Sequence, residues 1–142
     1  MFPRSVRVLD RRRAVASVHA GDFCSLSSGV KIWCVSSDFV NDIVCILPPD
    51  IADIGVRPIE GDVVMKDYTA VGANSVIMPR NLVPEGTVIG ALSFVPPSFV
   101  FEPWSVYAGM PIRQVGKRNR AAVTRQAAQL RQHMADRVRQ AR

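Results

Sequence analysis

The stretch MKDYTAVGANSVIMPRNLVPEGTVIGALSFV, residues 65–95, decides the fold through the spacing of its apolar residues. Counting in steps of six through residues 59–107, which include this stretch, meets nine apolar residues in succession: Ile59, Met65, Val71, Ile77, Val83, Ile89, Val95, Phe101 and Tyr107. Because 48% of the chain is apolar, such a run would arise by chance in about one register of several hundred. The six-residue repeat is therefore a property of the fold and not of the composition.

This period excludes both a long helix and a flat strand, because those structures need apolar recurrences near 3.6 and near 2 residues. Helix-breaking residues also recur through the segment: Gly61, Pro79, Pro84, Gly86, Gly90, Pro96, Pro97 and Pro103. A second set of positions, which begins at Val63 and also recurs every six residues, holds mostly small or β-favouring residues. The pattern predicts short strands joined by tight corners, in a solenoid whose stacked turns share an apolar axis.

A weaker form of the same rhythm runs upstream, through Val8, Ala14, Ala20, Leu26 and Ile32. Ile59 follows Ile32 by 27 positions, which is not a multiple of six, so part of the chain is looped out between the two blocks. We assign the insertion to residues 35–58, VSSDFVNDIVCILPPDIADIGVRP. An extension from a regular scaffold often carries binding or catalytic residues, and a solvated loop without a role is the alternative.

The C-terminal part of the chain differs from the rest in charge and in period. Residues 117–142 contain eight Lys or Arg and one Asp, a subtotal of +7, so residues 1–116 carry −1 of the net +6. An apolar stripe at helical spacing predicts an amphipathic helix, with Val123, Ala127, Leu130, Met134 and Val138. We expect the stripe to pack on the solenoid or on a neighbouring subunit, because the rest of the chain offers no basic surface for nucleic acid.

Length and composition bound the class of protein. With 142 residues, the chain is expected to form a β-helix domain over residues 1–116 and a basic helix over 117–142. No apolar run approaches the ~18–20 residues that span a bilayer, and the N-terminal MFPRSVRVLDRRR lacks the apolar stretch of a signal peptide. The sequence thus predicts a soluble cytoplasmic protein. Three cysteines without metal-ligand spacing predict neither a zinc site nor a disulfide framework.

Two segments carry a resemblance to a known family. VGANSVIMP (71–79) and SVYAGMPIRQV (105–115), in this order and phase, resemble the C-terminal half of hexapeptide-repeat acyltransferases. They are most similar to the sugar acetyltransferases of bacterial surface-polysaccharide pathways, which include lipopolysaccharide biosynthesis. The resemblance implies a left-handed parallel β-helix and a homotrimer. It also implies that acetyl-CoA lies in the groove between adjacent prisms, with a nucleotide-linked sugar near the extended loop.

The resemblance also implies roles for residues of the later turns. Small corner residues would let the pantetheine arm of CoA approach the main chain, although tight corners need small residues in any case. These residues are Ala73, Ala91 and Gly109. Pro111 matches the position where the family's ending turns beside the adenine of CoA. Lys117 and Arg118 would pair with the phosphates of CoA, the alternative being that this basic pair is merely solvated.

The general base departs from the family's pattern. Many members carry a histidine near the extended loop, whereas this chain has only His19, in the first block, and His133, on the basic helix. A general base contributes ~10²–10⁴-fold, which a hydroxyl acceptor can hardly forgo, while an amine needs only to lose its proton to water or to a carboxylate. The sequence therefore favours an amino-sugar acceptor. His19 remains a candidate catalytic residue because histidine readily serves as a base.

Asp38, within the loop segment VSSDFVND, is the leading candidate to orient or deprotonate such an ammonium group. Asn41 and Asp42 would help to bind the acceptor, and capping of the loop by Asx-type hydrogen bonds is the alternative role of all three. We expect acetyl-CoA-dependent N-acetylation of a nucleotide-linked amino sugar. Sugar O-acetylation and a non-catalytic trimeric scaffold are the alternatives. Zinc hydratases of this fold are excluded, because they need three histidine ligands and the solenoid segment has one.

Overall fold

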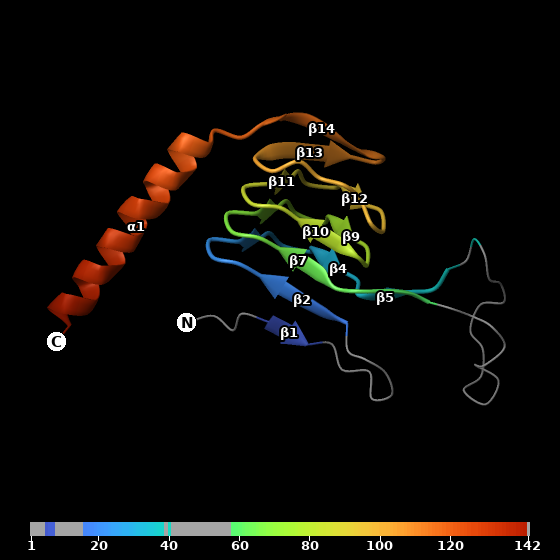
Figure 1. Cartoon of the computed structure of the whole chain (residues 1–142), viewed down its shortest axis with the longest axis horizontal. Coiled ribbons are helices and arrows are strands. Elements are labelled where there is room, and N and C mark those ends of the chain that lie inside the picture. Colours follow the sequence, from blue (N-terminus) through green and yellow to red (C-terminus); the bar gives the residue numbers. More distant parts are fainter. Residues whose placement is uncertain (1–4, 8–15, 39, 41–57, 142) are drawn as a thin grey trace.

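The structure, a computed structural model, describes residues 5–7, 16–38, 40 and 58–141. Short parallel strands stack into a coil with three flat sides, and one helix follows the coil at its C-terminal end (Figure 1). This confirms a mainly β fold with a C-terminal helix. No helix of the described residues is both long and apolar enough to cross a membrane.

Each side of the coil is a sheet whose parallel strands come from successive turns. Face A consists of β2 (Ser17–Ala20), β7 (Val63–Met65) and β10 (Asn81–Val83). Face B consists of β3 (Ser25–Leu26), β8 (Ala70–Val71), β11 (Val88–Ile89) and β13 (Ser105–Gly109). Face C consists of β4 (Lys31–Ile32), β9 (Val76–Ile77) and β12 (Phe94–Val95). We call the corner between faces A and B corner AB (21–24, 66–69, 84–87 and 102–104), and the corner between B and C corner BC (27–30, 72–75 and 90–93).

The register between turns explains the six-residue period. Asn81 pairs with Val63 and Val88 with Ala70, so one turn takes 18 residues, which is three units of six. Between the first and second turns the offset is larger, because Val18 pairs with Val63, 45 positions away. The difference between 45 and 18 leaves 27 additional residues at that point of the coil.

The additional residues leave the coil beside an antiparallel pair. β5 (Val35–Ser36) pairs with β6 (Ile59–Glu60), so the chain departs and returns at one place, to the right in Figure 1. Asn41, Asp42 and most of the extension lie outside the described residues, as do Val8 and Ala14. The division of the chain into two domains stays a prediction.

The apolar register forms the core of the coil. Eight of its nine residues are buried, none more than 8% exposed: Met65, Val71, Ile77, Val83, Ile89, Val95, Phe101 and Tyr107. Ile59 is the exception and is only half-buried, because it lies in the antiparallel pair at the base of the extension. Each buried aliphatic side chain is worth about 1.5–3 kcal/mol, so the stacked turns stabilise one another.

The second register supplies polar side chains to the interior of the corners. Asn81, which is 2% exposed, donates from Nδ2 to the carbonyls of Met78 (2.8 Å) and Pro96 (2.9 Å), and its Oδ1 accepts from the main-chain N–H of Phe99 (3.0 Å). Within the described part of the chain, no buried polar side-chain atom lacks a partner. These bonds tie each turn to the next and remove the cost of burying polar groups.

The coil ends in a hairpin that the repeat did not predict. β14 (Ile112–Lys117) folds back antiparallel on β13 at the top of the coil (Figure 1). Phe99, Phe101 and Tyr107 close the apolar axis there, with ring centroids 4.8–5.8 Å apart in edge-to-face pairs. At the opposite end, β1 (Ser5–Arg7) pairs antiparallel with β2.

Helix α1 (Arg120–Gln140) runs back along corner AB. It begins at Asn119, whose Oδ1 accepts from the main-chain N–H of Ala122 at 3.0 Å. Further contacts link it to the corner: the Arg120 guanidinium lies 5.3 Å from the Trp104 ring centre, and that of Arg131 lies 4.7 Å from the Phe23 ring centre. Three turns of the coil rise about 14 Å and eleven helical residues rise about 16 Å, so the two contacts are compatible with a straight helix.

Candidate active site

Corner BC brings together four of the residues predicted to bind the cofactor. The main-chain N–H of Leu92 donates to the carbonyl of Ala73 (2.9 Å), and the N–H of Gly109 donates to Oγ of Ser93 (3.1 Å), which places three successive turns directly above one another. In this column the predicted residues are Ala73, Ala91 and Gly109, with Pro111 exposed in the turn that follows. The structure thus assembles these four residues, and their role in cofactor binding stays a prediction.

Close packing at this corner requires the absence of side chains. A Cβ atom added at Gly72 would lie 2.3 Å from the nitrogen of Ala91, and one added at Gly90 would lie 3.0 Å from the Cβ of Ala108. The main-chain N–H of Ala91 has no hydrogen-bond acceptor within residues 16–38, 40 and 58–141. The corner therefore combines small residues with a main-chain donor that has no acceptor among the described residues, which is suited to an extended polar ligand.

Lys117 and Arg118 lie at corner AB, away from these four residues. The Lys117 ammonium is 2.6 Å from a carboxylate oxygen of Glu102 and donates to the Ser105 hydroxyl at 3.0 Å. A guanidinium nitrogen of Arg118 donates to the main-chain carbonyls of Tyr68 and Gly86. Burial lowers the pKa of Arg118 from its ordinary value, because removal from water disfavours the charged form. Both cations thus already have partners in the fold.

His19 lies on the outer side of face A, where it is exposed. Its Nε2 is 2.7 Å from the hydroxyl of Ser17, and that hydroxyl is 3.2 Å from Oδ1 of Asp62. The same oxygen accepts from the main-chain N–H of Ser17 at 2.7 Å. Face A lies opposite corner BC in the three-sided coil. Within one chain, His19 is therefore not close to Ala91.

Asp38 follows β5 at the base of the extension. Its Oδ1 accepts from the main-chain N–H of Val40 at 3.2 Å, which is the Asx-type contact considered as its alternative role. This bond is compatible with capping, and the proton-transfer role of Asp38 stays a prediction. Asn41 and Asp42 lie outside the described residues, and the acceptor-binding role of all three stays a prediction.

Sequence reasoning missed Asp62 as a partner of Ser17 and His19. Ser17 and His19 are two positions apart in a strand and therefore share a face, which the alternation of a strand could have indicated. Asp62 is 45 positions from Ser17 and comes next to it only because the extension is looped out. Sequence spacing alone gives no signal for such a contact.

The described cysteines and acidic residues form no metal site. No group of three His, Cys, Asp or Glu side chains in the described residues is arranged to hold a metal ion. Cys24 and Cys34 are free thiols. Burial, and to a lesser degree the negative charge of Asp62, raises the pKa of Cys34, although a main-chain hydrogen bond at Val63 opposes the shift. Cys34 is therefore a neutral core side chain.

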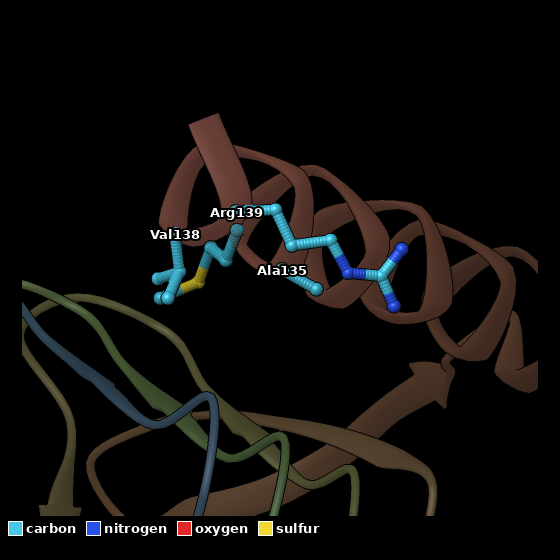
Figure 2. A pocket seen from close by; sticks show the side chains of 4 residues that line it. Ala135, Val138 and Arg139 are labelled. Atoms are coloured by element: carbon cyan, nitrogen blue, oxygen red, sulfur yellow. The ribbon is translucent and has the colours of Figure 1, made fainter. Parts of the chain in front are cut away.

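A hollow lies on the last turns of α1, away from the predicted site residues. Figure 2 shows Ala135, Val138 and Arg139 at this hollow, and Met134 completes its lining. The apolar stripe of α1 is buried only at Ala127, whereas Met134 and Val138 are 58% and 59% exposed. The apolar stripe of the helix therefore packs on the coil at Ala127 and is largely uncovered at Met134 and Val138.

Comparisons with known proteins agree with the fold and the sequence motifs. No protein-family model matches the chain. A probable macrolide acetyltransferase from Lysinibacillus sphaericus is 31% identical over 107 residues, which are 69% of this chain and 58% of that protein. AntD, an N-acyltransferase from Bacillus cereus solved with dTDP and 3-hydroxybutyryl-CoA, is 28% identical with a TM-score of 0.69, over 82% of this chain and 60% of AntD. The chain is thus similar in sequence and fold to acyltransferases, in agreement with its resemblance to the hexapeptide-repeat type.

Other solved structures extend the comparison. AntD variants at one aspartate and at one serine have been solved with coenzyme A, the latter together with dTDP-4-amino-4,6-dideoxyglucose. The polysialic acid O-acetyltransferase OatWY shares the fold, at 24% identity and a TM-score of 0.53. This chain spans less than two thirds of the length of the macrolide acetyltransferase relative and of AntD.

Proposed function

We propose that this hexapeptide-repeat protein transfers an acetyl group from acetyl-CoA to the amino group of a nucleotide-linked amino sugar. The observation that carries the proposal is the similarity to AntD over 82% of this chain, since AntD is an N-acyltransferase that has been solved with coenzyme A and a dTDP-linked amino sugar. Acetyl is the proposed acyl group because the macrolide relative is an acetyltransferase. The product would be a precursor of a surface polysaccharide such as lipopolysaccharide, made in the cytoplasm.

The cofactor end of the proposed site is corner BC. An acyl-CoA arm would lie along Ala73, Ala91 and Gly109, where the main-chain N–H of Ala91 is available to a carbonyl oxygen. The adenine would lie at Pro111, at the end of the column nearest the last hairpin. This orientation directs the acyl end toward the first turn of the coil. Ser28 occupies that end, because the main-chain N–H of Asn74 donates to its carbonyl at 3.0 Å.

A spacing in the sequence supports Ser28 and Asp38 as a pair at the acyl end. The substituted serine and aspartate of AntD are as far apart in that chain as Ser28 and Asp38 are in this one. No other serine of this chain precedes an aspartate by that distance. We therefore propose that the Ser28 hydroxyl hydrogen-bonds the acyl carbonyl oxygen and that Asp38 accepts a proton from the amino group.

The reaction follows from these roles. Acetyl-CoA supplies an activated thioester, so the protein has to align the amine and remove its proton. The Asp38 carboxylate takes one proton from the sugar ammonium, which leaves a nucleophilic amine. Transfer forms a C–N bond and breaks the C–S bond, and the second proton of the amine goes to the departing thiolate of CoA by way of water. The Ser28 hydroxyl stabilises the negative charge on the acyl carbonyl oxygen, while the Ala91 N–H, two turns further along the column, binds the pantetheine arm.

The proposed assembly is a homotrimer of left-handed coils, as the family resemblance implies. The arrangement of the site supports it, because Asp38 and corner BC lie on different parts of one chain and a neighbouring copy would bring them together. Apolar side chains are also exposed on the outside of the coil. Leu82, Leu92 and Val100 are 54%, 68% and 86% exposed, and such surface is typical of subunit contacts.

Sugar O-acetylation is the second candidate, favoured by one contact. The 2.7 Å distance between Nε2 of His19 and the Ser17 hydroxyl holds an exposed imidazole in place, and an imidazole is the usual base for a hydroxyl acceptor. A histidine from a neighbouring subunit would then serve the acyl end at corner BC.

Release of CoA from acetyl-CoA, in the presence of nucleotide-linked sugars, tests the proposal. Each dTDP- or UDP-linked amino sugar is paired with the matched sugar that carries a hydroxyl in place of the amine. The proposal predicts CoA release with amino sugars only, and an N-acetylated product by mass spectrometry. Release with the hydroxyl sugars would favour O-acetylation. No release with any sugar, together with no binding of acetyl-CoA, would leave the non-catalytic scaffold as the better account.

A further inference from the structure

The last hairpin carries its positive charges at two ends, and only one end adjoins corner BC. In the β13–β14 register, Ser105 pairs with Lys117 and Ala108 pairs with Arg113. Ser105 and Gly109 are four positions apart along the strand, so the two ends lie about 13 Å apart. Arg113 is therefore beside the Ala91 column, whereas Lys117 is at corner AB.

The cations at corner AB hold the fold together. Arg118 joins three turns there, because its guanidinium donates to the carbonyls of Tyr68 and Gly86 and its main-chain N–H donates to the carbonyl of Trp104 at 2.8 Å. Lys117 is paired with Glu102 at 2.6 Å. To bind a phosphate, either side chain would first have to give up these partners. Such an exchange gains little, since it replaces existing charge-assisted hydrogen bonds with new ones.

Arg113 makes no such contacts with the described residues. Within the part of the chain that the structure describes, its guanidinium has neither an ion pair nor a hydrogen-bond acceptor. Its neighbour Ile112 is 6% exposed and lies inward, while Arg113 is exposed and lies on the outer side of the hairpin. Ala108, its cross-strand partner, follows inward-facing Tyr107 and so also faces outward. The guanidinium is thus presented on the outer surface at the end of the column nearest Pro111.

We propose that Arg113, and not Lys117 or Arg118, binds the phosphates of acyl-CoA. The proposal rests on the proposed function, because it takes corner BC as the cofactor site, and it names the side chain that holds the anionic part of the cofactor. A guanidinium presents a planar set of donors that matches phosphate oxygens in a bidentate manner. Both the 3′-phosphate and the diphosphate of CoA offer this chemistry.

Binding of CoA to purified variants tests the proposal by isothermal titration calorimetry. Arg113→Ala is expected to weaken CoA binding about 10- to 100-fold, the range for loss of a charge-assisted pair. Arg113→Lys is expected to recover part of the loss. Arg125→Ala removes an equal charge from exposed α1 and serves as the control, with unchanged affinity. Because Arg113 has no partner in the described residues, the melting temperature of Arg113→Ala is expected to match that of the wild type.

Dephospho-CoA, which lacks the 3′-phosphate and keeps the diphosphate, shows which of the two groups Arg113 binds. If the 3′-phosphate is the partner, Arg113→Ala and the wild type bind dephospho-CoA equally. If the diphosphate is the partner, the loss persists with dephospho-CoA. Unchanged CoA affinity in Arg113→Ala would overturn this inference, above all if Lys117→Ala loses affinity instead. No binding of CoA by the wild type would overturn the proposed function itself, so the two failures are distinguishable.

Discussion

The hydroxyl of Ser17 stands between Nε2 of His19, at 2.7 Å, and a carboxylate oxygen of Asp62, at 3.2 Å. An ionised carboxylate only accepts hydrogen bonds, so the Ser17 hydroxyl donates to Asp62 and accepts from the Nε2–H of His19. This direction fixes the tautomer of the imidazole and leaves its Nδ1 as a proton acceptor. The chain therefore presents an oriented histidine on face A.

The tautomer of His19 follows from this chain of hydrogen bonds. In ¹⁵N-labelled protein carrying His133→Gln, which removes the other histidine, we expect the neutral His19 ring to carry its proton on Nε2. Ser17→Ala is expected to shift the ring nitrogen resonances toward a mixture of tautomers, while Ser17→Thr retains the wild-type pattern. A neutral ring protonated on Nδ1 in the wild type would contradict the assigned direction of these bonds.

Asp38→Asn is predicted to lower kcat for an amino-sugar nucleotide by about 10²–10⁴-fold, the usual contribution of a general base. CoA affinity is expected to stay unchanged, because Asp38 does not lie at corner BC. Asp136→Asn, which removes a half-buried carboxylate of α1, is the matched control. Steady-state kinetics at saturating acetyl-CoA make the comparison, and equal turnover by Asp38→Asn and the control would exclude Asp38 as the base.

Ser28→Ala is predicted to lower kcat by about 10–100-fold with little change in the KM for acetyl-CoA, since a donor to the carbonyl oxygen acts mainly in the transition state. Ser27 is the adjacent exposed serine, and Ser27→Ala is expected to behave as the wild type. The decisive measurement is the ratio of kcat between the two variants. A ratio near one would remove Ser28 from the acyl end.

Gly86→Ala is predicted to destabilise the fold by about 2–4 kcal/mol, from a left-handed backbone and overpacking together. Gly86 has φ of 71°, and a Cβ there would lie 2.3 Å from the Trp104 ring. The substitution would displace Trp104 from Tyr68, whose ring centre is 5.9 Å away. Gly116→Ala is the control, because nothing lies within 4 Å of its added Cβ. Urea unfolding compares the two, and equal free energies of unfolding would refute the packing argument.

The sequence predicted the coil well because its core is periodic. Burial of Met65, Val71 and Ile77 follows from spacing alone, since each turn repeats the same inward positions. Ile59 fails for a local reason, which is its place in the antiparallel pair at the extension. The final hairpin was missed because β14 reverses direction, and a period cannot encode a reversal.

The candidate site was harder to predict because its contacts join distant parts of the chain. The resemblance implies that Lys117 and Arg118 pair with phosphates, which stays a prediction, and sequence spacing gives no sign that Arg118 contacts the carbonyl of Tyr68, 50 positions earlier. The pairing of β13 with β14 is what places Lys117 and Arg118 at corner AB, away from corner BC. The stacking of Ala73 and Ala91 could be predicted from the sequence, because successive turns are offset by a constant 18 residues.

The most direct test of the account is acetyl transfer to a dTDP-linked amino sugar by the purified chain. Acetyl-CoA and dTDP-4-amino-4,6-dideoxyglucose are incubated with the protein, and free CoA thiol and the mass of the sugar nucleotide are measured together. The account predicts one CoA released for each N-acetylated sugar formed. Absence of both products from a folded protein, with the other amino-sugar nucleotides also unreactive, would contradict it.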